Sequence, residues 1–489
     1  MSALASAQKP ALGVRLTNRV AVFDVDPDDY EAVSQHFQYR PPNYRFTYGY
    51  INGGDGYKKL MQRSRVAAGL FLDRLKELEK KFIVVIKDER TSMRLGGTDR
   101  ENYLRPYQQE AVEAMTAASK TGGLILNATG TGKTRIAGAY FRRVSGPCVF
   151  VCDELALMEQ SRRSIEETLG EEVGTVGNSK FAPRRVTVAT VQTLAKHSGK
   201  PEFKRWFETI TAMIIDEVHV ALNKRNIDVV RSVKPLAVFG LTATLEIEKP
   251  WVRLPALALT GPVLFTYTME QGVKEGYLAA GVIVRLRFED PLTGVAPAYK
   301  SLSQGTEITV AAGSKAAEYR HHVVLNKRRN DMIEAVVREG VKRGRRAVVL
   351  VEQKAHLAVL SSRLRDLRPA VLSGAVDSED RLAAMKRMDA GKLDVIIASR
   401  VFSKGVDVQS VSLIVDATAL PGSNGAVQRY GRGARKDGDK VLLYVDVSDS
   451  GSDFEGAAKS RMRALRSTGS PMVEIKWKGE ASSVFDAVK

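Results

Sequence analysis

Short apolar runs separated by helical patterns recur through the first half of the chain. Runs of Val, Ile and Leu that alternate with helices are typical of buried parallel strands joined by crossover helices. The pattern therefore predicts an α/β lobe with a parallel sheet at residues 96–262. The strands expected in this lobe are Gly123–Leu126, Cys148–Cys152, Arg185–Thr190, Ala212–Asp216 and Ala237–Thr242.

A second series of the same kind follows in the other half of the chain. Its expected strands are Ala347–Val351, Val395–Ala398, Leu413–Asp416 and Val441–Val445. The fold class we predict is therefore α/β, with two tandem lobes that each have a parallel sheet and helices on both faces. We assign the second lobe, with the linker before it, to residues 263–449, and place the linker near Pro255–Asp290.

The two ends of the chain have different patterns. Residues 1–95 predict a small α/β accessory domain, probed for DNA binding below, with strands near Arg19–Phe23, Tyr44–Tyr50 and Phe82–Ile86 and a helix near Ala68–Lys81. Residues 291–316 are rich in Gly, Ala and Ser and predict a flexible excursion. Residues 450–489 are rich in Ser, Gly and charge, and we expect a loosely ordered tail.

Composition and charge narrow the class of protein. A length of 489 residues favours two or three domains, because single cores stop growing near roughly 250–300 residues. The formal charge of +18 indicates a polyanionic partner such as DNA. Only two cysteines occur, and neither a membrane span nor a signal peptide is indicated, so we expect a cytoplasmic protein. Nothing in the pattern indicates a coiled coil, so a monomer is expected.

A phosphate-binding loop follows the first expected strand. The segment Asn127–Thr134 reads Asn-Ala-Thr-Gly-Thr-Gly-Lys-Thr and precedes a helical pattern, the context in which backbone N–H groups cradle phosphates. Asn127 replaces the first glycine of the strict eight-residue motif. In such a loop the lysine neutralises the β and γ phosphates of ATP and the last hydroxyl reaches Mg²⁺. The residues expected to bind ATP here are Thr129, Gly130, Thr131, Gly132, Lys133 and Thr134.

An acidic pair follows another expected strand. Met213–Ile215 leads directly to Asp216 and Glu217, so both carboxylates lie at the carboxyl end of the strand, where open α/β sheets bind ligands. Asp216 is placed to hold Mg²⁺, and Glu217 is placed to orient the attacking water. A lone acidic pair is more often a helix cap or a solvated loop, but the phosphate-binding loop favours the catalytic interpretation.

The second lobe offers arginines in place of a phosphate-binding loop. In Gln428–Arg435, the side chains of Arg432 and Arg435 are three residues apart near the start of an expected helix and can point the same way. Arginines that reach a γ-phosphate increase turnover by about 10³ to 10⁵. From spacing alone, a solvated turn or a contact with a phosphate backbone stays open.

The motifs occur in an order that resembles superfamily 2 helicases of the DExH type, over about residues 100–446. The resemblance implies two RecA-like lobes and ATP hydrolysis with Mg²⁺ as cofactor. It also implies adenine recognition by Arg105 and Gln108 in the segment Leu104–Gln108. The matching segments are Leu104–Gln108, Asn127–Thr134, Val151–Gln160, Thr190–Thr193, Asp216–His219, Leu241–Thr244, Val348–Glu352, Ser399–Asp407 and Gln428–Arg435.

Further roles are implied by this resemblance, residue by residue. Gly405 and Asp407 would face the nucleotide from the second lobe, while Gln428, Arg432 and Arg435 would act in catalysis. Hydrolysis would be coupled to strand movement by His219, Thr242 and Thr244. Phosphates of the bound strand would be held by Thr190 and Ser399, although helix capping explains these two hydroxyls equally well.

Two segments resemble one branch of the superfamily in particular. Gly272–Ala280 and Asn326–Asn330 are similar to the XPB-like branch and, with the small N-terminal domain, to phage UvsW-type helicases. The resemblance implies a DNA helicase that reverses forks, migrates junctions and unwinds short duplexes, in recombination, repair or replication and, if phage-encoded, in the host cytoplasm. The alternatives are an RNA-directed helicase, a restriction-type translocase motor, and a clamp in which ATP only times release of nucleic acid.

The N-terminal domain contains a segment with two interpretations. Tyr39–Phe46 interleaves basic and aromatic residues, which could hold phosphates and stack on exposed bases. The alternation of Tyr44, Phe46 and Tyr48 also fits the buried face of a strand. The period of two favours the strand.

Overall fold

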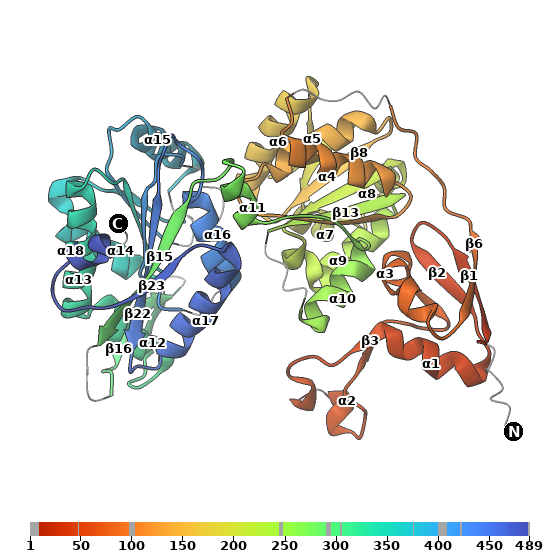
Figure 1. Ribbon diagram of the computed structural model, residues 1–489, viewed down its shortest axis with the longest axis horizontal. Coiled ribbons are helices and arrows are strands. Elements are labelled where there is room, and N and C mark those ends of the chain that lie inside the picture. The colour runs from red at the N-terminus through yellow and green to blue at the C-terminus, as the bar shows by residue number, and fades with distance from the viewer. Residues whose placement is uncertain are drawn as a thin grey trace, which may run out of the picture. The chain divides into compact units, whose positions relative to one another are not determined.

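The chain divides into two compact units (Figure 1). The computed structural model describes residues 9–46, 48–96, 103–243, 248–289, 295–303, 306–374, 376–399, 408–420 and 423–487. The first unit comprises Met1–Ala128 and Gly132–Tyr267, and the second comprises Thr129–Thr131 and Thr268–Lys489. Each unit, taken by itself, contains a parallel sheet covered by helices, which confirms the predicted α/β class with two lobes.

The first lobe is organised around an eight-stranded sheet in the order β10-β9-β11-β8-β12-β13-β7-β14. All neighbouring strands are parallel except β10 and β9. Each of the five strands that the apolar runs predicted is present. The strands are β7 (Gly122–Asn127), β8 (Cys148–Cys152), β9 (Gly174–Gly177), β10 (Lys180–Ala182), β11 (Val186–Thr190), β12 (Ala212–Asp216), β13 (Ala237–Thr242) and β14 (Val263–Tyr267).

Successive residues of each buried strand enter two different cores. On β12, Ile214 packs into the core under α4, α5 and α6, whereas Met213 and Ile215 pack on the other face, under α7 to α10. Burial on both faces explains why these strands are continuous apolar runs. The helices are α4 (Pro106–Ala117), α5 (Lys133–Arg143), α6 (Leu155–Leu169), α7 (Val191–His197), α8 (Pro201–Thr209), α9 (Lys224–Val233) and α10 (Pro250–Leu259).

The N-terminal domain is a four-stranded sheet in the order β5-β2-β1-β6 with α1 and α3 against it. The expected strands near Arg19–Phe23 and Phe82–Ile86 and the expected helix are present. The expected strand Tyr44–Tyr50 is wrong, because this segment holds a 3-10 turn and the short helix α2 (Tyr48–Ile51). The other elements are β1 (Ala11–Leu16), β2 (Val20–Asp24), β5 (Arg65–Ala67), β6 (Ile83–Asp88), α1 (Tyr30–Ser34) and α3 (Ala68–Leu78).

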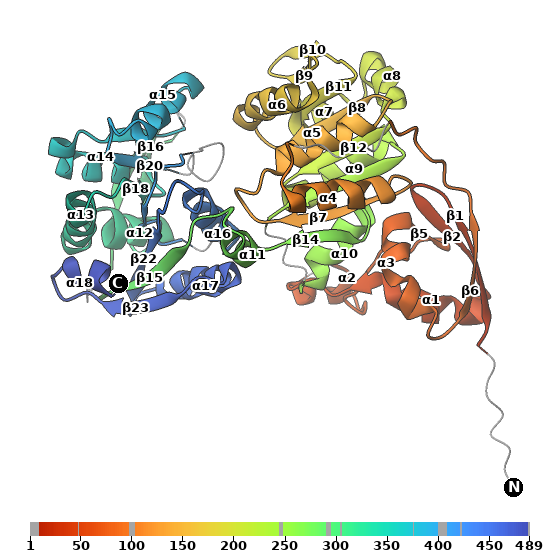
Figure 2. The same ribbon diagram turned by 45° about the horizontal axis from the view of Figure 1, so that its top comes forward.

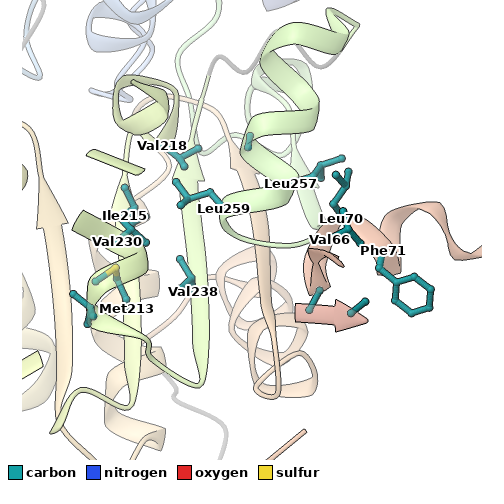
Figure 3. Close-up of a cluster of buried hydrophobic side chains, with 14 of the residues drawn as sticks. Val66, Leu70, Phe71, Met213, Ile215, Val218, Val230, Val238, Leu257 and Leu259 are labelled. Atoms are coloured by element: carbon teal, nitrogen blue, oxygen red, sulfur yellow. The ribbon is translucent and has the colours of Figure 1, made fainter. Parts of the chain in front are cut away.

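One apolar cluster joins the N-terminal domain to the first lobe. Leu70 and Phe71 of α3 belong to the same buried cluster as Leu257 of α10 and Ile215 of β12 (Figure 3). In both general views α3 lies beside α10 (Figures 1 and 2). The N-terminal domain and the first lobe therefore form a single unit.

The second lobe has a seven-stranded parallel sheet in the order β19-β20-β18-β21-β22-β15-β23. Helices α13, α14 and α18 lie on one face, and α16 and α17 lie on the other (Figure 1). The sheet strands are β15 (Gly281–Glu289), β18 (Ala347–Leu350), β19 (Ala370–Leu372), β20 (Val395–Ala398), β21 (Leu413–Asp416), β22 (Leu442–Ser450) and β23 (Met472–Lys476). The helices are α11 (Met269–Lys274), α12 (Lys315–Tyr319), α13 (Lys327–Lys342), α14 (Lys354–Arg363), α15 (Ser378–Asp389), α16 (Ser423–Gly433), α17 (Glu455–Leu465) and α18 (Ser482–Asp486).

The expectation of a loosely ordered tail at residues 450–489 is wrong. Strand β23 pairs with β15 at the edge of the second sheet, and α18 packs on α13 with Val484 and Phe485 in the core. Arg461 of α17 is fully buried on Asp446. The described residues within 291–316 include an antiparallel hairpin of β16 (Tyr299–Ser303) and β17 (Thr306–Val310), which corrects the expected flexible excursion.

Regular structure also occupies the expected linker. Pro255 lies within α10, β14 completes the first sheet, and α11 and β15 belong to the second unit. Cys148 and Cys152 are buried free thiols, and burial raises the pKa of Cys148 to about 12. None of the described helices combines the length and apolar composition that a membrane span requires.

We predict that Phe485→Ala lowers the free energy of unfolding by about 3–5 kcal/mol, because it removes a buried aromatic side chain from the second core. Chemical denaturation followed by circular dichroism measures this loss. Lys478→Ala, at an exposed position of the same segment, is the matched control and should change stability by less than about 0.5 kcal/mol. Equal stability of the two variants would contradict the packed C-terminal segment.

Candidate nucleotide site

The phosphate-binding loop has the strand-loop-helix context that the sequence predicted. Strand β7 ends at Asn127 and α5 begins at Lys133. Gly130 and Gly132 adopt positive φ angles of 89° and 81°, which side chains with a Cβ rarely adopt. These two glycines let the backbone turn tightly enough to direct successive N–H groups into one concavity.

Gln108 lies directly against this loop. A Cβ at Gly132 would be 2.5 Å from the Gln108 Nε2 atom, so only glycine leaves room for the amide. The Arg105 N–H donates to Gln108 Oε1 at 3.1 Å, and the two residues form a capping box at the start of α4. The structure thus brings Gln108 and Arg105 beside the loop, as the motif order predicted.

Sequence reasoning missed an aromatic pair behind the loop. The rings of Tyr107 and Tyr267 stack with centroids 3.9 Å apart and an interplanar angle of 9°. The Tyr267 carbonyl accepts a hydrogen bond of 3.0 Å from Ala128 N–H, at the start of the loop. Tyr107 also accepts a hydrogen bond from Arg105 Nη1 at 3.2 Å. The position of Tyr107 next to Gln108 was the signal available in the sequence.

Strand β12 delivers the two carboxylates at its carboxyl end. Glu217 has φ 45° and ψ 55°, a left-handed conformation that is strained for a non-glycine residue. Its N–H donates to Asp216 Oδ1 at 3.0 Å. Strained backbone of this kind clusters at active sites, because the surrounding structure must hold it in place.

A chain of polar contacts links the phosphate-binding loop to the acidic pair and to β13. The Lys133 ammonium lies 3.5 Å from Glu217 Oε1. Thr242 Oγ1, at the end of β13, donates to Glu217 Oε2 at 3.2 Å and lies 3.1 Å from His219 Nδ1. Four predicted site residues from three motifs therefore meet at one edge of the sheet.

The oxygen donors present fit Mg²⁺. This ion binds one or two protein oxygens and completes its shell with water and substrate phosphates. Thr134 lies in the first turn of α5 and Asp216 ends β12, which supplies one hydroxyl and one carboxylate. Asn127 is fully buried, and neither of its amide atoms has a hydrogen-bond partner among the described residues. A buried polar group left unpaired beside the loop is consistent with a polar ligand.

The candidate nucleic-acid residues have local partners. Thr190 caps α7, where its hydroxyl accepts from Thr193 N–H at 3.4 Å and donates to Thr193 Oγ1 at 2.8 Å. This contact confirms helix capping and leaves the phosphate contact a prediction. Ser399 follows β20, and its N–H donates to the Leu372 carbonyl at 3.0 Å. Three further predicted residues lie outside the described residues: Thr244, Gly405 and Asp407.

Helix α16 of the second lobe carries Gln428 and Arg432, and Arg435 follows its end. A buried ion pair that the sequence did not predict fixes this helix. Arg429 donates to Asp416 Oδ2 from Nε at 3.0 Å and from Nη2 at 2.7 Å. Asp416, the last residue of β21, is fully buried.

Two hydroxyl groups and two guanidinium groups compensate the charge of Asp416. The Tyr444 and Thr418 hydroxyls each donate to Asp416 at 2.6 Å. Burial alone would raise the pKa of Asp416, but the Arg429 and Arg461 guanidinium groups hold that pKa well below its usual range. The carboxylate therefore stays charged and anchors α16 to the sheet.

Close packing adds to this anchor. A Cβ at Gly433 would lie 2.7 Å from Ile414 Cδ1 and 2.8 Å from Leu442 Cδ1. Glycine lets the last turn of α16 approach the sheet closely. The helix that carries Arg432 is therefore held by both charge and packing.

A phosphate-binding loop, a carboxylate pair at the end of a neighbouring strand and a second parallel α/β lobe with an arginine-bearing helix define a P-loop nucleoside triphosphatase with two RecA-like lobes. Comparison with known proteins refines this class. Residues 101–247 match the family model described as type III restriction enzyme, res subunit. Residues 328–437 match the helicase conserved C-terminal domain.

Two relatives and one solved structure agree with these matches. DNA 3'-5' translocase XPB2 of Sulfurisphaera tokodaii is 23% identical over 390 residues, which cover 73% of this chain and 84% of the relative. ATP-dependent DNA helicase uvsW of Enterobacteria phage T4 is 26% identical over 272 residues, which cover 54% and 50%. The structure of S. cerevisiae Dbp5 bound to RNA and ADP BeF3 matches 79% of this chain and 97% of that chain, with 14% identity and a TM-score of 0.54.

The chain belongs to the superfamily 2 helicases, a class of enzymes that hydrolyse ATP, and within it to the DNA helicases and translocases similar to XPB and UvsW. The matched regions are parts of longer relatives in several cases. The chain spans 58% of a Rad25-type relative from Halobacterium salinarum and half of uvsW. The likeness to Dbp5 shows the fold alone.

We predict that Asp416→Asn lowers the free energy of unfolding by about 3–5 kcal/mol, because it leaves the buried Arg429 guanidinium without its counter-charge. Denaturant titration of the purified variant measures the loss. Asp437→Asn, an exposed position after α16, is the matched control and should be within about 0.5 kcal/mol of the unchanged protein. A stability equal to that control would show that Asp416 does not anchor the helix.

Proposed function

We propose that this protein is an ATP-dependent DNA helicase or translocase that remodels branched DNA by fork reversal, branch migration and unwinding of short duplexes. The observation that carries the proposal is the chain of contacts from Lys133 through Glu217 and Thr242 to His219. It links the residues that would bind and hydrolyse ATP to those that would report hydrolysis to the strand-binding surface.

Hydrolysis in this proposal requires no covalent intermediate. Lys133 neutralises the β and γ phosphates of ATP, and Glu217 orients the attacking water for in-line displacement. Mg²⁺, held by Thr134 and Asp216, would supply Lewis-acid stabilisation of the phosphate charge. From the second lobe, Arg432 and Arg435 stabilise the transition-state charge, with Gln428 beside them.

Thr242 is the central element of the proposed coupling. Its hydroxyl contacts both Glu217 and His219, so a change in the charge around Glu217 alters the hydrogen bond that His219 can make. Because β13 lies between β12 and β7 in the sheet, the same strand receives changes from the carboxylates and from the phosphate-binding loop. The small displacement would be passed to the DNA-binding surface.

DNA is the partner that charge and relatives favour. The formal charge of +18 would release counterions from phosphates on binding. Thr190 and Ser399 are the residues we assign to the phosphates of the bound strand. Branched DNA is inferred from the similarity to uvsW, and roles in recombination, repair or replication, a phage origin, a monomeric state and a cytoplasmic location belong to the same proposal.

A restriction-type translocase motor is the second candidate function. It is favoured by the match of residues 101–247 to the res subunit of type III restriction enzymes. Such a motor would be stimulated by linear duplex as strongly as by forks and junctions. Substrate preference therefore separates the two candidates.

We predict that Lys133→Ala and Glu217→Gln each reduce ATP turnover by about 10² or more, because each removes a group that acts on the phosphates or on the water. Lys133→Ala should also weaken ATP binding, whereas Glu217→Gln should leave it nearly unchanged. Phosphate release and binding of a fluorescent ATP analogue measure the two effects. Lys200→Ala, at an exposed lysine of the same lobe, is the control, and retained turnover in either site variant would sink the site assignment.

We predict that ATP hydrolysis by the unchanged protein is stimulated more strongly by forks and four-way junctions than by linear DNA. The measurement compares no nucleic acid, single-stranded DNA, linear duplex, fork, junction and matched RNAs at fixed salt. A strand-displacement assay on the same forks distinguishes a helicase from a clamp that turns over ATP and displaces nothing. Preference for RNA, or equal stimulation by linear duplex, would contradict branch remodelling.

A further inference from the structure

A closed loop of the N-terminal domain contains the segment for which the sequence allowed two interpretations. Strands β3 (Gln38–Tyr39) and β4 (Lys58–Lys59) pair in antiparallel fashion and close this loop. Between them lie a 3-10 turn at Tyr44–Phe46 and the helix α2. We name residues 38–59 the aromatic protrusion. No strand in its described residues buries the aromatic side chains.

Large apolar side chains are unusually exposed on the aromatic protrusion. Phe46 is 84% exposed and Ile51 is 68% exposed, while Tyr50 and Tyr57 are each 39% exposed. Single exposed apolar residues are common, but several on one short segment indicate a surface that binds something. The aromatic rings offer flat faces on which planar groups can stack.

Cations and rings hold the aromatic protrusion in a defined shape. The Arg40 guanidinium lies 4.4 Å from the ring centroid of Tyr57 and 5.2 Å from that of Tyr44. Tyr44 and Tyr50 make an edge-to-face contact with centroids 5.1 Å apart. A Cβ at Gly56 would lie 2.5 Å from Tyr44 Cδ2, so this ring packs on a bare backbone. A surface arranged in advance loses less entropy on binding.

The charge of the aromatic protrusion is complementary to a polyanion. Its only acidic residue in the sequence is Asp55, whose carboxylate accepts from the Tyr57 N–H. Basic groups next to aromatic faces are the combination that binds single-stranded nucleic acid, because bases stack while phosphates pair with cations. The basic residues are Arg40, Arg45, Lys58 and Lys59, with Arg63 and Arg65 just beyond.

The aromatic protrusion is mounted on the lobe that carries the nucleotide site. Helix α3 approaches the first lobe so closely that a Cβ at Gly69 would lie 2.3 Å from the Cα atom of Gly261. Arg253 of α10 donates to both oxygens of Asp73 of α3, at 3.0 and 3.2 Å. With the shared apolar cluster, these contacts make the protrusion part of one rigid unit with Lys133 (Figure 3).

We propose that the aromatic protrusion binds the unpaired bases at a DNA branch point. Phe46 and Tyr50 stack on the bases, and Arg40, Arg45 and Lys58 pair with the adjacent phosphates. The inference rests on the proposed function, which it deepens by naming the surface that distinguishes a branch from a linear duplex. Because this surface is fixed to the first lobe, it holds the branch point at a constant distance from the phosphate-binding loop.

The test compares the affinity of the full-length protein for a fork with unpaired arms and for a blunt duplex of equal length. Fluorescence anisotropy at fixed salt gives both dissociation constants. Stacking of one base on an aromatic side chain changes affinity by about 5- to 100-fold. Phe46→Ala should therefore weaken fork binding by about tenfold and change duplex binding by less than about twofold, and Phe46→Trp should restore fork binding.

A second readout follows the bases directly. A 2-aminopurine placed at the branch point should change its fluorescence when the unchanged protein binds, and should change little with Phe46→Ala. Arg45→Ala should reduce the salt dependence of fork binding by about one unit of slope, as expected for one lost phosphate contact. A 2-aminopurine signal that is the same for Phe46→Ala and the unchanged protein would overturn the stacking role.

The matched controls are Val85→Ala and Lys87→Ala on β6 of the same domain. Val85 is 60% exposed and the Lys87 side chain is 77% exposed, so they resemble the test positions in exposure but lie outside the aromatic protrusion. Both should bind forks as the unchanged protein does. Thermal unfolding confirms that Phe46→Ala folds, as its exposure implies.

The outcomes separate this inference from the proposed function. If forks stimulate ATP hydrolysis by the unchanged protein and Phe46→Ala binds forks equally well, the aromatic protrusion is not the branch-binding surface and the proposed function stands. Equal weakening of fork and duplex binding by Phe46→Ala would also overturn the inference, because paired bases offer no face for stacking. If no DNA stimulates hydrolysis, the proposed function fails instead.

Discussion

The convergence of strand ends at one edge of the first sheet is the constraint on which the nucleotide site depends. In the register of β12, β13 and β7, Asp216 is paired with Leu241, and Thr242 is paired with Leu126. Since these strands are parallel, their carboxyl ends all point to the same edge. The ammonium of Lys133 and the carboxylate of Glu217 meet there although 84 positions separate them in the sequence (133 to 217). No local segment could produce that contact.

This edge carries features that cost stability and that the sheet must offset. Glu217 has a strained backbone, and Asn127 has a buried amide without a partner among the described residues. Each costs on the order of 1–3 kcal/mol. The strands beneath them are buried on both faces, so apolar burial at roughly 25 cal/mol per Å² stabilises the edge from below. Costly features at one edge and a continuous apolar interior are the division expected when binding is built into a stable fold.

Sequence patterns predicted the parts of the structure that local chemistry determines. The continuous apolar runs became β7, β8, β11, β12 and β13, because strands buried on both faces need apolar residues at every position. The strand expected at Tyr44–Tyr50 was wrong, since the rings there pack on Gly56 and under Arg40, and an alternating pattern cannot reveal such contacts. Arg461 looked like a solvated tail residue, and only its distant partner Asp446 explains its burial.

The two units hold their functional groups in different ways. In the first, apolar packing fixes the N-terminal domain to the lobe, so the aromatic protrusion and Lys133 share one rigid body. In the second, a buried carboxylate holds α16, because Asp416 accepts from Arg429 inside the core. Ion pairs without solvent tolerate little displacement, since separating them exposes unpaired charge in a medium of low dielectric constant. In the proposed cycle, Arg432 therefore moves with its whole lobe, and the energy of ATP binding is converted into motion of one unit against the other.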